Sequence, residues 1–191
     1  MKKMWFLGLV VIAVLFSACD SKSPIDSSAI SKSKVNEVKE AFEPQSFALV
    51  TSNEKYISFK STEEGLDFDE FKGKKAVLID VFATWCPPCI ESVPMLNELR
   101  STYGESFEIV SVLFEQDKAI EEVQAFIKEH GITYPVSVSE EENFRFAKEL
   151  GDVQKIPEMF LFSKDGKFVK KFVGKVSKEE LERYIKIAVE N

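Results

Sequence analysis

The sequence has few of the two residue types that bind most transition metals. Its 191 residues include three cysteines and one histidine. A structural zinc site needs four ligands, which usually come as two cysteine or histidine pairs. This chain has one such pair, Cys86 and Cys89, and its single histidine, His130, is far away in the sequence. The ligand count excludes a structural zinc site, and we predict neither a bound metal nor a cofactor.

A basic stripe is also missing from the chain. Lysine and arginine number 25 against 32 acidic residues, so the formal net charge is −7. Nucleic-acid binding depends on clustered basic side chains that neutralise phosphates. A nucleic acid is therefore not an expected partner.

No hydrophobic run is long enough to cross a bilayer. The apolar run at 4–16 falls short of the ~20 residues that a spanning helix needs. Two lysines precede this run, and the small residues Ser17 and Ala18 separate it from Cys19. This pattern indicates an export signal and is similar to a bacterial lipoprotein signal peptide over residues 1–18. A cleaved secretion signal and an uncleaved anchor are the alternatives.

A lipidated Cys19 determines how the rest of the chain is organised. Lipid on this residue would hold the protein at the outer face of the cytoplasmic membrane, with its domain in the periplasm. Removal of the signal leaves 23 basic against 32 acidic residues, a net charge of −9. Residues 19–45 are rich in serine and lysine and are expected to form a flexible tether, in which 35–45 is either a short amphipathic helix or more linker. Residues 46–191 have the size of one domain.

Strand and helix patterns alternate within this domain. Strands are expected at 47–59 (a hairpin turning at Ser52 and Asn53), 76–83, 107–114, 134–138, 159–163 and 168–174. Helices are expected at 88–104, 118–131, around 143–150 and at 177–191. This order predicts an α/β fold with a mixed central sheet flanked by helices.

The Cys86 and Cys89 pair can hold a metal, form a static crosslink or exchange electrons. Cys86 lies between a predicted strand and a predicted helix, so unpaired backbone N–H groups and the positive end of the helix are expected beside its sulfur. Both favour the thiolate, which makes Cys86 the expected nucleophile. Pro87 and Pro88 lack N–H groups, fit the first helical turn and stiffen it. A static disulfide that closes so short a loop would constrain little. The pattern thus favours electron transfer.

Asp80 is a candidate acid and base for this pair. It lies in the middle of the apolar segment 76–83. A buried carboxyl there has a raised pKa and can exchange a proton with Cys89. The alternative is a strand-end aspartate bonded to the backbone. His130 is expected to cap the C-terminus of the helix that ends at Gly131.

Residues from about 47 to 190 resemble the TlpA/ResA-like group of thioredoxin-fold thiol–disulfide oxidoreductases. The segments "FATWCPPC" and "KIPEMFLFSKDGKFVKKFVG" and the lipoprotein signal match in order and spacing. The resemblance implies a thioredoxin fold with an N-terminal β-hairpin extension. It also implies an envelope enzyme that reduces protein disulfides, with cytochrome c maturation as one role and a membrane electron donor of the thiol-reductase type. A copper-delivery lipoprotein of the same fold is the alternative, although copper carriers of this fold space their cysteines as CxxxC.

The same resemblance implies roles for individual residues. Cys86 matches an exposed nucleophilic cysteine and Cys89 a buried resolving cysteine. Trp85 matches the tryptophan that walls the active site, and Pro157 matches a cis-proline that faces the disulfide. A cis bond at Pro157 would turn the main chain of Ile156 toward Cys86, where it can pair with an extended substrate segment.

Three positions near the pair need separate treatment. Many relatives have asparagine where this chain has Asp80, although thioredoxin itself has a buried acid. Relatives often have threonine where this chain has Met159, which affects substrate preference. Glu158 is either a second acid near the sulfurs, within the substrate-binding set, or a solvated turn residue.

Overall fold

The computed structural model describes residues 42–190. The predicted signal peptide, the lipidation site Cys19 and the tether up to residue 41 lie outside the described residues. Residues 42–45 form neither helix nor strand. None of the helices in the described part has the length and apolar character to span a membrane.

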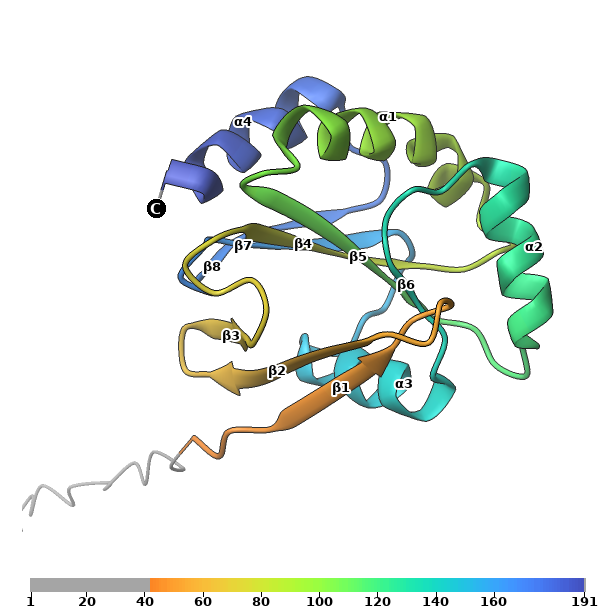
Figure 1. The fold of residues 1–191 in the computed structure, drawn as a ribbon, viewed down its shortest axis with the longest axis horizontal. Helices are drawn as coiled ribbons and strands as arrows, with labels where there is room; N and C mark the ends of the chain where they lie inside the picture. The colour runs from red at the N-terminus through yellow and green to blue at the C-terminus, as the bar shows by residue number, and fades with distance from the viewer. Residues whose placement is uncertain (1–41, 191) are drawn as a thin grey trace, which may run out of the picture. The chain divides into compact units, whose positions relative to one another are not determined.

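A five-stranded mixed sheet forms the centre of the domain, as predicted (Figure 1). Its strands, in chain order, are β4 (Ala76–Phe82), β5 (Phe107–Leu113), β6 (Val136–Ser137), β7 (Glu158–Phe162) and β8 (Phe168–Val173). Their spatial order is β6-β5-β4-β7-β8. The first three run parallel, whereas β7 is antiparallel to both β4 and β8. Every residue of β4 and β5 is buried, because both faces of the sheet are covered.

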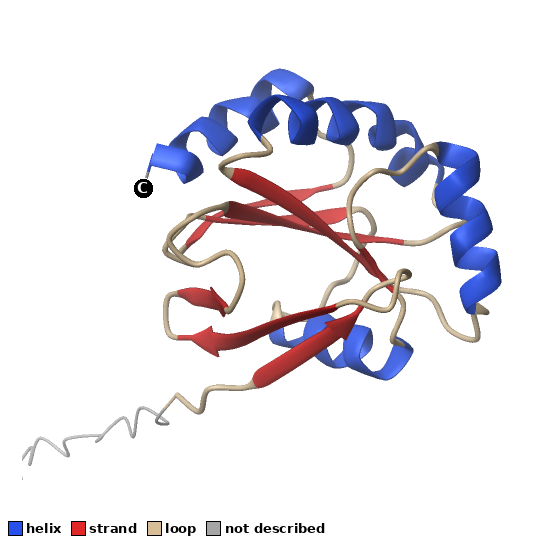
Figure 2. Cartoon of the chain, viewed as in Figure 1, coloured by secondary structure: helices blue, strands red, loops and turns tan. Residues whose placement is uncertain are grey.

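Helices cover both faces of this sheet (Figure 2). They are α1 (Pro87–Tyr103), α2 (Ile120–His130), α3 (Glu140–Glu149) and α4 (Lys178–Glu190). On one face α1 and α4 bury leucine and isoleucine side chains against the sheet, namely Leu96, Leu99, Leu181 and Ile185. On the other face, α3 packs beside the N-terminal strands.

A three-stranded antiparallel sheet covers the second face together with α3. It consists of β1 (Ser46–Val50), β2 (Tyr56–Thr62) and β3 (Gly65–Phe68). In its aromatic core the ring of Phe59 stacks on Phe47 and lies tilted against Phe146, with centroid distances of 5.2 and 4.7 Å. The predicted hairpin is confirmed, and β3 is an additional strand that the sequence pattern did not indicate.

Local chemistry explains where the observed elements differ from the predicted ones. The predicted strand 134–138 shortens to β6, because Pro135 has no N–H group for the ladder. The helix expected around residue 143 begins at Glu140, where three consecutive glutamates lie in its first turn and favour the positive helix end. The tip of the first hairpin bridges from Thr51 to Ser137 and so covers the edge of β6.

Candidate active site

Residue alternation divides β4 between the two faces of the sheet. Val77, Ile79 and Val81 pack in the core shared with β1, β2, β3 and α3. Leu78 and Phe82 pack on the side of α1, and Asp80 lies between them on that side. The carboxyl group of Asp80 therefore faces the helix that carries the cysteines.

The cysteine pair lies where β4 gives way to α1. Cys86 is the N-cap of α1, and its sulfur is bonded to that of Cys89, with Cα atoms 5.3 Å apart. Both cysteines pack in a cluster with Phe82, Leu113 and Phe126. The predicted pair is thus a disulfide at a helix N-terminus.

The expected difference in exposure between the two cysteines is wrong for this disulfide form. Cys86 is 3% exposed and Cys89 is 6% exposed. The cluster with Phe82 covers both sulfurs, so burial does not distinguish an outer nucleophile from an inner partner. The adjacent Trp85 is 65% exposed, which makes it the open part of the loop.

The expected free N–H groups beside Cys86 are also not found. Pro87 and Pro88 have none, and the N–H groups of Cys89 and Ile90 donate to the Cys86 carbonyl at 3.0 and 3.1 Å. Pro87 and Pro88 therefore leave no donors at the first two positions of the helix. Of the two causes proposed for a stabilised thiolate, the helix dipole remains.

A carboxylate that sequence reasoning missed holds this loop. The backbone N–H and the hydroxyl of Thr84 both donate to Glu115 Oε2, at 3.0 and 2.7 Å. Glu115 follows the end of β5, the strand next to β4. The available signal was an acid just after a buried strand, at the sheet end where the cysteine loop begins.

The loop before β7 packs on the hydrophobic cluster that contains the two cysteines. The peptide bond between Ile156 and Pro157 is cis, as predicted. Ile156 packs on the cluster that contains Cys86 and Cys89. Two segments about 70 residues apart in sequence therefore meet at one cluster.

Asp80 is buried and bonded to a hydroxyl group. The Ser111 hydroxyl donates to Asp80 Oδ2 at 2.7 Å from the neighbouring strand. Burial raises the pKa of Asp80 to about 6, although this hydrogen bond opposes the rise. The alternative of a strand-end residue bonded to backbone is wrong, since Asp80 lies inside β4 and its partner is a side chain. Met159 lies opposite Asp80 in the β4–β7 pairing and adds to its apolar surroundings.

Glu158 is not a solvated turn residue. It begins β7, is 3% exposed, and its Oε2 lies 2.6 Å from Lys171 Nζ. Its other oxygen accepts from the backbone N–H groups of Gln154 and Lys155, at 3.4 and 3.3 Å. Glu158 lies opposite Val81 in the strand pairing, so its side chain is on the β1–β3 face, away from Asp80.

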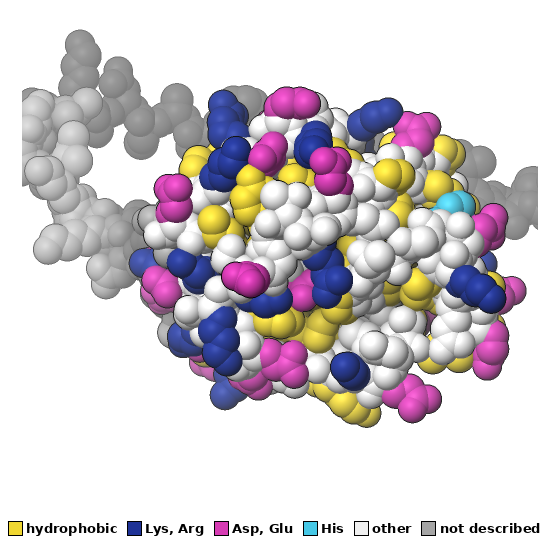
Figure 3. All heavy atoms as spheres, turned by 45° about the horizontal axis from the view of Figure 1, so that its top comes forward, with side chains coloured by type: hydrophobic (Ala, Val, Ile, Leu, Met, Phe, Trp, Pro, Cys, Tyr) yellow, Lys and Arg dark blue, Asp and Glu magenta, His cyan; other side chains and the backbone are white. Residues whose placement is uncertain are grey.

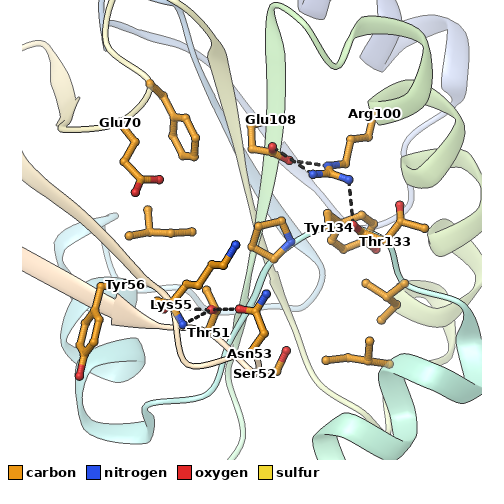
Figure 4. A pocket seen from close by; sticks show the side chains of 15 residues that line it. Thr51, Ser52, Asn53, Lys55, Tyr56, Glu70, Arg100, Glu108, Thr133 and Tyr134 are labelled. Atoms are coloured by element: carbon orange, nitrogen blue, oxygen red, sulfur yellow. Dashed lines mark hydrogen bonds and ion pairs between the residues drawn. The ribbon is translucent and has the colours of Figure 1, made fainter.

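The remaining candidates lie outside the disulfide cluster. His130 ends α2 as predicted, and its ring packs on Phe126 with centroids 4.4 Å apart. Within residues 42–190, no group of three or more His, Cys, Asp or Glu side chains is placed to hold a metal ion. A pocket of about 490 Å³ opens near Arg100 and Tyr134, but none of the predicted site residues lines it (Figure 4).

Charges of both signs are mixed on the surface. On the face shown in Figure 3, basic and acidic side chains alternate without a continuous block of one sign. Elsewhere in the described residues, charged side chains form surface salt bridges such as Lys175 with Glu91 and Lys186 with Glu182.

Comparisons with known proteins agree with this geometry. The profile of the Redoxin family matches residues 51–185. A thiol-disulfide oxidoreductase ResA of Bacillus thuringiensis (strain Al Hakam) is 29% identical over 187 residues, covering 97% of this chain and 98% of that protein. A thioredoxin-family thiol:disulfide interchange protein of Chlorobium tepidum TLS is 29% identical in sequence, with a TM-score of 0.59 over 78% of this chain and 99% of that chain.

A third comparison concerns the fold alone. The crystal structure of StoA from Bacillus subtilis has a TM-score of 0.57 at 24% identity, over 74% of this chain and 97% of that chain. With the bonded Cys86 and Cys89 pair, the match over most of the chain decides the assignment. The chain belongs to the Redoxin family, in which it is a thiol–disulfide oxidoreductase of the thioredoxin fold.

Proposed function

We propose that this enzyme is a lipid-anchored reductant of protein disulfides in the cell envelope. The observation that carries the proposal is the Cys86–Cys89 disulfide at the N-terminus of α1, in the hydrophobic cluster on which Ile156 packs. A pair of this kind passes two electrons by thiol–disulfide exchange. Cys86, Cys89 and Asp80 form the proposed catalytic set.

The reaction starts from the reduced enzyme. The Cys86 thiolate attacks a substrate disulfide, and one substrate sulfur leaves as a thiolate while a mixed disulfide forms. Cys89 then gives its proton to the Asp80 carboxylate and attacks the Cys86 sulfur. The second substrate thiolate leaves, the enzyme disulfide forms, and two electrons have moved to the substrate.

Substrate docking uses the surface around the disulfide. Trp85 gives an exposed apolar wall beside the cysteines. The main chain of Ile156 offers N–H and C=O groups to an extended segment of the substrate, which would pair as an added strand. We place Glu158 behind this loop, since it binds the N–H groups of Gln154 and Lys155 rather than solvent.

The cellular setting follows from the export signal and the family resemblance. Lipid on Cys19 would keep the domain beside the membrane, close to a membrane donor of the thiol-reductase type. An envelope that oxidises thiols needs such a reductant wherever a protein must keep free cysteines. The cysteines of apocytochrome c are one such substrate.

Single cysteine variants test the roles of the pair. Cys86→Ser is expected to abolish reduction of a disulfide substrate such as insulin. Cys89→Ser should still attack and then accumulate as a mixed disulfide, which mass spectrometry detects as an adduct on Cys86. Normal turnover by Cys89→Ala in a dithiol assay would contradict the assigned roles.

The reduction potential of the pair tests the direction of electron flow. A value near the thioredoxin range of about −270 mV supports a reductant, whereas a value near about −120 mV supports an oxidant. Anchoring has its own test, because Cys19→Ser should lose incorporation of labelled fatty acid and leave the membrane fraction. An unchanged membrane fraction would contradict the lipid anchor.

A further inference from the structure

Two hydroxyl side chains continue from Asp80 on the α1 side of the sheet. Ser111 lies directly opposite Asp80 in the β4–β5 register and donates to its carboxylate at 2.7 Å. Tyr134 lies close to both groups, since burial and the Asp80 charge raise the pKa of Tyr134 and the Ser111 hydroxyl opposes this rise. Ser111 and Tyr134 are both buried. A carboxyl, an alcohol and a phenol therefore lie together inside the protein.

Backbone hydrogen bonds hold Ser111 and Tyr134 in place. The N–H of Ser111 donates to the Pro135 carbonyl at 2.9 Å, which holds the adjacent Tyr134 beside β5. Figure 4 shows Tyr134 next to Thr133, whose carbonyl accepts from Arg100 at 2.8 Å. Tyr134 packs in the same core as Leu78, one position along its face from Asp80.

Burial of the Ser111 hydroxyl would destabilise the fold without its hydrogen bond to Asp80. Ile109 and Leu113, the neighbours of Ser111 on the same face of β5, are buried and apolar. A hydroxyl at such a position loses water and needs a partner to offset the loss. Its one proton goes to Asp80 when the carboxylate is ionised, so the Ser111 oxygen keeps lone pairs that can accept a proton from a nearby donor such as Tyr134.

Few other titratable groups turn toward Asp80 in the described residues. β5 brings Ser111, β7 brings the uncharged Met159, and Tyr134 is near enough for the Asp80 charge to raise its pKa, while α1 on the same side of the sheet carries Cys89. Nearby charged groups are directed elsewhere. Glu108 is bound to Arg100 and Lys75, and Glu158 lies on the opposite face with Lys171.

We propose that Ser111 and Tyr134 are positioning residues that set the proton affinity of Asp80, and with it the pH at which Asp80 takes the proton of Cys89. This inference rests on the proposed function of Asp80. Ser111 stabilises the ionised carboxylate directly by donating to it. Tyr134 would strengthen that hydrogen bond by donating its own proton to the Ser111 oxygen. The step moves one proton from the Cys89 thiol to Asp80 and changes no other bond.

Direct titration of Asp80 in the oxidised protein tests the proton affinity. The side-chain carboxyl ¹³C shift of Asp80 reports its midpoint, which starts from about 6. Ser111→Ala is expected to raise this midpoint by about one pH unit, the effect of one hydrogen bond to a charged group. Tyr134→Phe should raise it by a smaller amount, and Ser111→Thr, which keeps the hydroxyl, should restore the original value.

Two matched variants separate this effect from general loosening of the fold. Ser163→Ala removes a buried hydroxyl just after β7, directly before the turn that starts at Lys164. Tyr103→Phe removes a phenol that is bound to Glu182. Both should leave the Asp80 midpoint unchanged. Tyr134→Phe deletes a single oxygen atom, so it keeps the test valid if Ser111→Ala does not fold.

The reaction supplies an independent readout. Asp80 accepts a proton as a base, so the rate of mixed-disulfide resolution should rise with pH through its midpoint. Ser111→Ala should shift this increase in rate to higher pH. When Ser111→Ala is added to Asp80→Asn, the pH dependence of the rate should not shift. An unchanged Asp80 midpoint in folded Ser111→Ala, or an equal movement in both backgrounds, would overturn the proposal. Absence of insulin reduction by the unsubstituted enzyme would instead count against the proposed function.

Discussion

Asp80 and Glu158 are buried acids on neighbouring strands, and they differ in what compensates their burial. Asp80 on β4 has the hydroxyl of Ser111 at 2.7 Å, whereas Glu158 on β7 has the ammonium group of Lys171 at 2.6 Å. They lie on opposite faces of one sheet. The face with α1 and the cysteines holds the acid without a cation, and the face with β1–β3 holds the acid with one.

The comparison shows how one sheet can give two carboxyl groups different tasks. Because the partner of Asp80 is neutral, burial leaves its pKa raised to about 6. This value is close to neutral pH, where a carboxyl group can both accept and donate a proton. A cationic partner offsets the burial of Glu158, and the other oxygen of Glu158 accepts from the backbone N–H groups of Gln154 and Lys155. We infer that Asp80 serves proton transfer and that Glu158 holds the loop.

Removal of the cation from Glu158 should have the largest effect. Lys171→Met keeps an unbranched side chain near the Phe160 ring but leaves a buried carboxylate without its ion pair. We expect the free energy of unfolding to fall by about 3–5 kcal/mol, measured by urea denaturation at pH 7.

Two further variants show whether the unpaired charge is the cause. Lys167→Met breaks an exposed pair with Glu64 and should cost at most about 1 kcal/mol. The double variant Glu158→Gln and Lys171→Met removes both charges and should recover part of the lost stability. Equal losses in the single and double variants would contradict the idea that a buried charge needs its cation.

Asp80→Asn should raise the free energy of unfolding at neutral pH, whereas Lys171→Met lowers it. Folding raises the pKa of Asp80 from 3.8 to about 6, so between these values the folded state holds a proton that the unfolded state has lost. The stability contributed by the protonated group is present near pH 4 and is lost as pH rises to about 6. We expect Asp80→Asn to be more stable than the parent by about 3 kcal/mol at pH 7 and nearly equal to it at pH 4. Urea denaturation at both pH values measures this, and an equal gain at both would contradict it.

The same substitution should slow one step of the reaction. Asparagine cannot accept the proton of Cys89, so release of the mixed disulfide should fall by about 10²-fold, at the low end for general base catalysis. Formation of the mixed disulfide by Cys86 should change much less. Stopped-flow measurement of the two steps separates them, and equal slowing of both would indicate a structural effect instead.

Much of this site was predictable because its signals are local. Cys86 and Cys89 are three residues apart, and the buried position of Asp80 follows from the unbroken apolar segment around it. The cis bond before Pro157 came from the resemblance of a short motif. The mixed central sheet flanked by helices followed from the alternation of strand and helix patterns, because parallel strands need a helical crossover.

The partners of these residues were not predictable, because they come from distant parts of the chain. Ser111 is 31 positions after Asp80 and reaches it only through the register of two strands. Lys171 reaches Glu158 through the β7–β8 hairpin, in a strand whose other lysine, Lys170, is directed at Tyr184. Periodicity assigns a residue to a face, but it does not specify which side chain lies opposite.

Glu115 offers the smallest of the expected effects and extends the comparison to a third acid. It is only partly buried, has Lys118 at 3.6 Å, and holds Thr84 through two hydrogen bonds. Glu115→Ala should lower the free energy of unfolding by about 1–2 kcal/mol, because both Thr84 donors lose their acceptor. Glu115→Gln keeps a side-chain oxygen for Thr84 and should lose less than half of that. Urea denaturation compares the two variants. An equal loss of stability in both variants would mean that the charge of Glu115 contributes more than its hydrogen bonds to Thr84. Glu115 would then resemble Glu158 in depending on its cation.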